Sequence, residues 1–102
     1  MSSKKHFILS YVYAADYFER RDAYRSEHLA RLKKAYEEGF LLFIGVLPER
    51  PGAVGVFYCD DIEQIRAFAK QDPYVLNGLV NEVRVMPWLP GVGPESILHP
   101  ES

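Results

Sequence analysis

The sequence of 102 residues contains little of what several classes of protein require. Its single cysteine, Cys59, cannot form an internal disulfide, which indicates a reducing compartment. No run approaches the ~20 consecutive apolar residues that a membrane-spanning helix needs. Residues 1–5 are not followed by the uninterrupted apolar stretch of a signal peptide. We therefore expect a cytoplasmic protein that makes no contact with a membrane.

Charge and catalytic motifs are equally sparse. The formal net charge is −2, and basic side chains do not cluster beyond residues 31–34, so nucleic acid binding is not indicated. A glycine-rich phosphate loop and a serine or cysteine nucleophile elbow are both absent. Metal sites use three or four ligands, whereas His6, His28 and His99 are scattered over a predicted strand, a helix and a tail. We expect neither a metal nor an organic cofactor.

Four segments have the β-branched and aromatic residues, and the lengths, that are typical of strands. They are residues 7–13, 40–46, 53–59 and 81–88. Two prolines and a glycine between the second and third segments predict a connection that closes a hairpin. In the last segment, alternation places Val83 and Val85 on one face and Arg84 and Met86 on the other.

Two further segments have the apolar periodicity of helices. The first runs from about residue 21 to 38, where Gly39 is a natural stop. The second runs from about residue 60 to 72 and ends there because a proline follows. Residues 74–79 predict one short additional turn. Capping-box spacing marks a turn before the first helix and the start of the second, at Asp16 with Glu19 and at Asp60 with Glu63.

The resulting order, β-α-β-β-α-β, predicts an α+β plait of the ferredoxin-like type. Both helices then cover one face of an antiparallel sheet, and the other face leaves a large apolar patch. A second copy of the chain is the simplest cover for such a patch. We expect residues 1–88 to form a single domain that dimerises through its sheet faces. The proline- and glycine-rich residues 89–102 are expected to form an irregular tail.

His28 occupies a position where a helix would ordinarily bury leucine. On a helical wheel it lies in the apolar stripe of the first helix, together with Arg21 and Arg25 on the preceding turns. The rest of that stripe consists of Tyr24, Leu29, Leu32, Ala35 and Tyr36. A polar group that faces a core costs ~1–3 kcal/mol unless it is hydrogen-bonded. The plait brings the end of the second helix to this region, so Asp72 is the expected partner of His28.

Two interpretations of this group stay open. As a catalytic dyad, Asp72 would orient the imidazole of His28 and raise its basicity, leaving the other ring nitrogen to take or give a proton. Arg25 would hold an anionic substrate group or stabilise developing negative charge, and Tyr74 would edge a pocket for a flat ligand. Alternatively, the polar residues form a buried network that only fixes the packing of the helices.

The chain contains four short motifs in a characteristic order and spacing. They are Arg25-x-x-His28-Leu29, Gly39-Phe40-Leu41 with Gly45, Asp72-Pro73-Tyr74 and Val85-Met86-Pro87-Trp88. Over about residues 6 to 88 the chain therefore resembles the YCII-related family. The resemblance implies a dimeric α-β barrel with an active site at His28 and Asp72. It also implies activities such as cofactor-free elimination of hydrogen halide from a chlorinated hydroxyquinol, and proton transfers like those of the similar muconolactone isomerases.

The sequence and the resemblance together predict a cofactor-independent enzyme that transfers a proton on a small catabolic intermediate. It would act as a lyase of the elimination or dehydrochlorination type, or as an isomerase. The first alternative is a non-catalytic ligand-binding or assembly module of the same fold. The second is a haem- or oxygen-using relative, for which only His28 offers a ligand. The expected partners are a small-molecule substrate and other copies of the chain, as a homodimer or a higher oligomer.

Overall fold

The computed structural model describes residues 4–93 of the chain. The elements are β1 (Lys5–Tyr13), α1 (Tyr17–Arg20), α2 (Asp22–Glu37), β2 (Leu41–Leu47), β3 (Gly52–Cys59), α3 (Ile62–Lys70), α4 (Pro73–Leu76) and β4 (Val80–Trp88). This is the predicted β-α-β-β-α-β order with two short helices added. His99 and most of the predicted tail lie outside the described residues, and the division into residues 1–88 and 89–102 stays a prediction.

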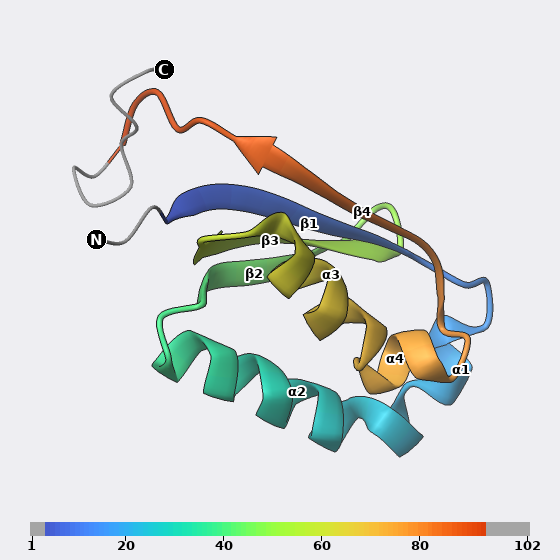
Figure 1. Ribbon diagram of the computed structural model, residues 1–102. Coiled ribbons are helices and arrows are strands. Elements are labelled where there is room, and N and C mark those ends of the chain that lie inside the picture. Colours follow the sequence, from blue (N-terminus) through green and yellow to red (C-terminus); the bar gives the residue numbers. More distant parts are fainter. Residues whose placement is uncertain (1–3, 94–102) are drawn as a thin grey trace.

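The four strands form one antiparallel sheet in the order β2-β3-β1-β4. Strand β1 is central, because Leu9 pairs with Gly55 of β3 on one side and with Val85 of β4 on the other. Figure 1 shows α2 and α3 on the same side of this sheet. The sequence order, the strand order and the one-sided helices are those of the predicted ferredoxin-like plait.

The core lies between the sheet and the helices. The strict alternation of β1 points Phe7, Leu9 and Tyr11 toward the helices, and each of these side chains is buried. Phe57 of β3 and Ile65 of α3 are completely buried in the same cluster. Burying one such side chain contributes roughly 1.5–3 kcal/mol, so this layer supplies most of the stability of so small a domain.

The opposite face of the sheet carries apolar side chains that remain exposed. We call it the open sheet face and define it by its four most exposed apolar residues, which are Val12, Phe43, Leu47 and Met86. Phe43 alone is 57% exposed. Among residues 4–93, no helix packs on this side (Figure 1). The apolar patch that the sequence predicts is therefore present.

The helix starts differ from the sequence prediction in detail. The capping box of α3 is built by Asp61, not by Asp60: the Asp61 carboxylate accepts from the Glu63 backbone N–H at 3.0 Å, and the Gln64 side chain accepts from the Asp61 N–H at 3.0 Å. The cap falls on Asp61 because this residue has the extended backbone that an N-cap requires. Asp16 does precede α1, but its side chain makes no cap hydrogen bond, so the capping box predicted there is wrong.

The buried stripe of α2 is narrower than the sequence predicts. His28 and Ala35 are buried as expected, and Leu32 packs against the core. Tyr36, which the helical wheel places in the stripe, is 63% exposed, and Leu29 is also exposed. The helix therefore contacts the core along a single line of side chains. None of the helices described is both long and apolar enough to cross a membrane.

Candidate active site

His28 and Asp72 are in direct contact, as the topology predicts. The Nδ1 atom of His28 lies 2.9 Å from Oδ1 and 3.1 Å from Oδ2 of Asp72. His28 comes from the N-terminal half of α2, and Asp72 precedes α4 at the same end of the molecule. The two residues are 7% and 1% exposed. The contact between two positions 44 residues apart is confirmed.

Asp72 has a local role that the sequence interpretation missed. It does not close the second predicted helix, because α3 already ends at Lys70. Asp72 is instead the N-cap of α4, where its Oδ1 accepts a hydrogen bond from the backbone N–H of Tyr74 at 2.9 Å. Pro73 follows at the first helical position, where its fixed φ is favourable and its missing N–H costs nothing. The Asp-Pro-Tyr motif thus fixes the carboxylate by local backbone geometry.

A third donor reaches the same carboxylate from the sheet. The hydroxyl of Tyr11 in β1 donates to Oδ2 of Asp72 at 2.9 Å. Burial alone would raise the pKa of Asp72, but the contacts of His28 and the donors from Tyr74 and Tyr11 outweigh it and hold the pKa below its usual range. Asp72 is therefore ionised, and it orients His28 by accepting from Nδ1–H. This leaves Nε2 as the imidazole nitrogen for chemistry.

A cavity of about 240 Å³ lies beside the pair. His28, Arg25 and Tyr74 line it, whereas Asp72 does not line it and supports His28 from behind. The structure thus brings the four predicted site residues together, three at the cavity surface and one beneath. The aliphatic part of the wall comes from Leu29 and Leu32 of α2, Ile44 and Val46 of β2, and Ala53 of β3.

Aromatic rings make up much of the remaining wall. The imidazole of His28 stacks on the ring of Tyr74, with centroids 3.8 Å apart and planes at 15°. Tyr13 of β1 stacks on Tyr17 of α1 at 3.7 Å with parallel planes. The ring of Tyr74 meets both in edge-to-face geometry. This packing fixes His28 from the side, while Asp72 fixes it from behind.

Four further lining residues were not assigned to the site from the sequence. They are Tyr11, Tyr13, Tyr17 and Arg21. The sequence did contain a signal for Tyr11 and Tyr13. Alternate residues of β1 share one face, and this strand ends where the first helix starts. Burial raises the pKa of both Tyr11 and Tyr13, the first further through Asp72 and the second further through Tyr17. Both phenols therefore stay protonated over the physiological range.

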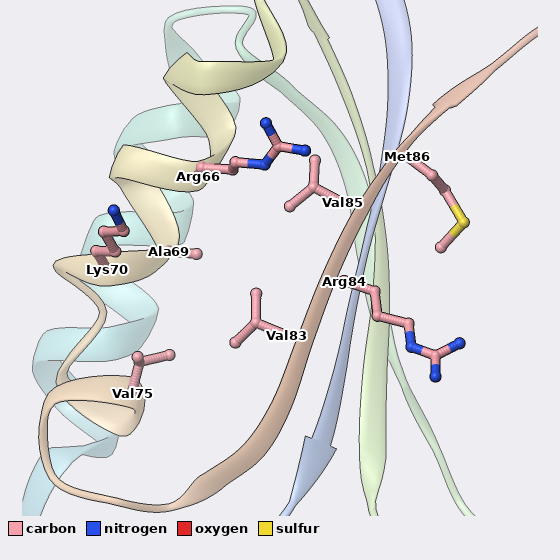
Figure 2. A pocket seen from close by; sticks show the side chains of 8 residues that line it. All are labelled: Arg66, Ala69, Lys70, Val75, Val83, Arg84, Val85 and Met86. Atoms are coloured by element: carbon pink, nitrogen blue, oxygen red, sulfur yellow. The ribbon is translucent and has the colours of Figure 1, made fainter.

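A larger groove, of about 540 Å³, lies between α3 and β4. Figure 2 shows Val83 and Val85 pointing across it toward α3, whereas Arg84 and Met86 point away from that helix, as the predicted alternation requires. The predicted site residues are all absent from its lining, and so is any acidic or histidine side chain. We therefore assign the candidate site to the smaller cavity, where the hydrogen-bonded pair lies.

The part of the chain described here has no cluster of three or more His, Cys, Asp or Glu side chains that could hold a metal ion. His6 lies on β1 and pairs in register with Tyr58, away from the cavity of His28. His99 lies outside the described range. The donor set at the candidate site is therefore one imidazole, two guanidinium groups and several phenols.

The family and its curated members match most of the chain. The YCII-related domain matches residues 5–89. Protein YciI of Escherichia coli O6:H1 is 36% identical over 94 residues, covering 79% of this chain and 96% of that protein. A Haemophilus influenzae protein is 35% identical over 80 residues, covering 69% and 82%.

Solved structures share the fold at low sequence identity. One is 5-chloro-2-hydroxyhydroquinone dehydrochlorinase from Burkholderia phenoliruptrix, in complex with 2,5-dihydroxybenzoquinone. It has a TM-score of 0.74 and 17% identity, covering 84% of this chain and 95% of its own. Rv0793 from Mycobacterium tuberculosis has a TM-score of 0.53 and 16% identity, covering 89% and 98%. These similarities confirm the predicted ferredoxin-like fold of the dimeric α-β barrel class.

Proposed function

The chain belongs to the YCII-related domain family, and from this premise we propose that it is a small-molecule enzyme in which His28 and Asp72 transfer a proton. One observation carries the proposal. The imidazole Nδ1 is bound to both oxygens of an ionised, buried carboxylate, while the same imidazole lines a cavity. A histidine that served packing alone would not need to border an empty space of about 240 Å³.

The proposed roles follow from the hydrogen bonds. Neutral His28 takes a proton from the substrate at Nε2, and Asp72 stabilises the imidazolium that forms. The lowered pKa of Asp72, which burial opposes and the contacts of His28, Tyr74 and Tyr11 produce, keeps this carboxylate ionised throughout. Tyr11 and the backbone N–H of Tyr74 hold it in place. Arg25 is the substrate contact that stabilises negative charge developing on an oxygen.

Two reactions use the same first step. When His28 removes a proton from the substrate, the electron pair left behind forms a new double bond. In an elimination, the bond to a leaving group such as chloride breaks, and chloride departs with that bond's electron pair. In an isomerisation, an existing double bond of the substrate breaks, and its electron pair takes the proton back from His28 at a different carbon. Neither reaction consumes an oxidant or a reductant, so the proposal requires no cofactor.

The dehydrochlorinase with the same fold supports the first of these reactions. Its name describes loss of hydrogen chloride from a hydroxylated ring, and its structure holds a single-ring quinone. A cavity of about 240 Å³ lies below the roughly 300–1,000 Å³ typical of sites for drug-sized ligands, and so matches a single-ring substrate. We place this chain in the same broad class, as a lyase or isomerase acting on a small ring compound.

A non-catalytic ligand-binding module is the competing function, and one observation favours it. Asp72 caps α4 and accepts from Tyr11, so the network has a structural purpose even without catalysis. The two functions differ in their requirement for the basic nitrogen. A module that only binds needs the shape of His28, whereas an enzyme also needs its Nε2 atom.

The deciding experiment is a turnover assay on a chlorinated hydroxyquinol, followed by chloride release and ultraviolet absorbance. We expect His28→Gln to lower turnover by about 10²–10⁴-fold, the usual contribution of general acid–base catalysis. His6→Gln is the matched control, because His6 is also buried but does not line the cavity. Equal turnover by His28→Gln and the wild type would overturn the proposal.

We also propose that the protein is a homodimer through the open sheet face. The support is the exposure of Val12, Phe43, Leu47 and Met86 on the side of the sheet without helices. Exposed apolar side chains gathered on one uncovered face are typical of an interaction surface. A twofold axis through this face would cover both patches at once. The cytoplasmic location stays a prediction from the sequence.

A further inference from the structure

We propose that the ligand of this cavity is a flat, single-ring anion whose negative group is held between Arg21 and Arg25. The proposal rests on the proposed function only in taking this cavity as the substrate site. It adds the charge and shape of the substrate and a second cation, Arg21, that sequence reasoning did not assign to the site.

The cavity wall is electropositive, because both Arg21 and Arg25 line it. None of its lining residues is acidic. The carboxylate of Asp72 lies behind the surface and already accepts from His28, Tyr11 and Tyr74. A cation or a donor-rich ligand would therefore find no charged acceptor in the wall. A ligand that carries an anionic oxygen meets complementary groups.

Both arginines have guanidinium groups available for a ligand. Within residues 4–93, Arg25 forms neither an ion pair nor a hydrogen bond. The ion pair of Arg21 is long, with 3.9 Å from Nε to Oδ1 of Asp22, and the Asp22 side chain is 90% exposed. The same Nε is buried without a hydrogen-bond partner among the described residues. The Arg21 side chain as a whole is 35% exposed, so its guanidinium is accessible to a ligand that supplies an acceptor.

Backbone geometry and neighbouring contacts hold Arg21 at this position. Arg21 joins α1 to α2 with helical backbone angles, φ −62° and ψ −32°, and its side chain lines the cavity. Its guanidinium lies over the rings of Tyr17 and Phe18, at 5.8 and 5.2 Å from their centroids. In addition, Arg20 donates to the carbonyl of Asn77 at 2.6 Å, which ties α1 to the end of α4.

Arg21, Arg25 and Tyr74 line the same cavity, and the charges of the two arginines act on the Tyr74 phenol. Burial raises the pKa of the Tyr74 phenol, and so does Tyr17, while the charges of Arg25 and Arg21 act in the opposite direction. Tyr74 stays protonated, so it adds a neutral donor to the wall that Arg21 and Arg25 also line.

The walls define the shape of the ligand. Tyr74 and the stacked pair of Tyr13 and Tyr17 form flat aromatic surfaces, and Leu32 and Val46 complete an apolar slot. Flat rings pack against such surfaces in stacked or edge-to-face geometry. The volume of about 240 Å³ admits one substituted ring. The ligand class is therefore a single-ring carboxylate, phenolate or enolate.

Calorimetric titration with two isosteric probes tests this proposal. The probes are 2,5-dihydroxybenzoate, an anion, and 2,5-dihydroxybenzamide, which has nearly the same shape without the charge. We expect the wild type to bind the benzoate about tenfold or more tightly than the amide, because one charge-assisted hydrogen bond contributes at least that factor. Arg21→Gln and Arg25→Gln should each weaken benzoate binding about tenfold and weaken amide binding much less, because the amide loses only a neutral hydrogen bond.

Arg66→Gln is the matched control. It removes the same charge from the exposed face of α3, where Arg66 pairs with Glu63 and lines the larger groove of Figure 2. Retention of the benzoate preference in this variant would support the proposal. Equal affinity of the wild type for both probes, no binding of either, or loss of the preference in Arg66→Gln instead would overturn it.

A fourth variant separates this proposal from the proposed function. His28→Gln should keep the benzoate preference, since both arginines remain. If proton transfer by His28 is wrong, the turnover assay fails while the charge preference persists. If the anion site is wrong, neither the wild type nor His28→Gln prefers the benzoate over the amide. The two failures are therefore distinguishable.

Discussion

Asp72→Asn is the substitution that tests the site most directly. Asparagine has the same shape as aspartate and is an equally good N-cap, so α4 keeps the hydrogen bond from the Tyr74 N–H. The side chain loses its charge and one of its two acceptor oxygens. His28 and Tyr11 then compete for the one side-chain oxygen that asparagine retains.

The expected magnitude follows from these contacts. A hydrogen bond to a charged group contributes about 1.5–3 kcal/mol, and Asp72 is only 1% exposed, so solvent cannot replace the lost partner. We expect Asp72→Asn to lower the free energy of unfolding by about 1.5–3 kcal/mol through loss of one such bond. Asp72→Ala also removes the cap and every acceptor, and should cost about 3–5 kcal/mol. Turnover should fall about 10²–10⁴-fold in both variants, because Asp72 no longer fixes the imidazole.

Urea denaturation at several pH values is the assay. The contacts of His28, Tyr74 and Tyr11 lower the pKa of Asp72 in the folded state against the effect of burial, so folding favours the ionised carboxylate. Its contribution to stability is complete above the unfolded pKa of about 3.8 and is lost as the pH falls through the lower folded value. The stability difference between the wild type and Asp72→Asn should therefore be largest near neutral pH and shrink in acid.

Asp61→Asn provides the control. Asp61 caps α3 with the same chemistry, but it is exposed and binds no histidine, so the exchange should change stability by less than about 0.5 kcal/mol. The reasoning fails if Asp72→Asn is as stable as the wild type. It fails equally if the difference between them stays constant from neutral pH into acid.

Three further predictions concern other parts of the molecule. His28→Ala should lower the free energy of unfolding by about 1–3 kcal/mol in urea denaturation, because it strands the buried Asp72 carboxylate; an unchanged midpoint would contradict the geometry. Phe43→Glu on the open sheet face should yield a monomer in sedimentation velocity, whereas Leu76→Glu, equally exposed on α4, should leave the dimer intact; a monomeric wild type would refute the interface. Gly52→Ala should cost about 1–3 kcal/mol in thermal unfolding, because its Cβ would collide with the backbone carbonyl of Tyr11; an unchanged melting temperature would show that this strand pair can move apart.

The fold was predictable because its signals are local and agree with one another. Alternation fixes the inward faces of β1 and β4, and the order of strands and helices leaves few topologies. The exceptions have local causes. The sequence offers two adjacent aspartates before α3, and only the backbone geometry decides that Asp61 and not Asp60 is the cap. Tyr36 satisfies the periodicity of α2 but projects beyond the line of core contact.

The site was predictable to the extent that it depends on topology. The plait brings the N-terminal half of α2 and the end of α3 together, so a polar His28 in an apolar stripe pointed to Asp72. The contributions of Tyr11 and Arg21 could not be derived in this way. Tyr11 contacts Asp72 across 61 positions of the chain, and Arg21 lies between α1 and α2, where the sequence predicted the start of a single helix.

The central position of β1 has a consequence for how the protein folds. Strand β1 comes first in the described chain, yet its pairing partners are β3 and β4, and the Leu9–Val85 pair joins nearly opposite ends of that chain. Contacts so distant in sequence form slowly, because the entropy of closing a large loop is lost before the strand hydrogen bonds can form. Until then, β1 has two unsatisfied edges and exposes the tyrosines of its inner face. Because Tyr11 lies on this strand and Asp72 follows α3, we expect the His28–Asp72 pair to acquire its complete hydrogen-bond network only late in folding, when the two ends of the domain have met.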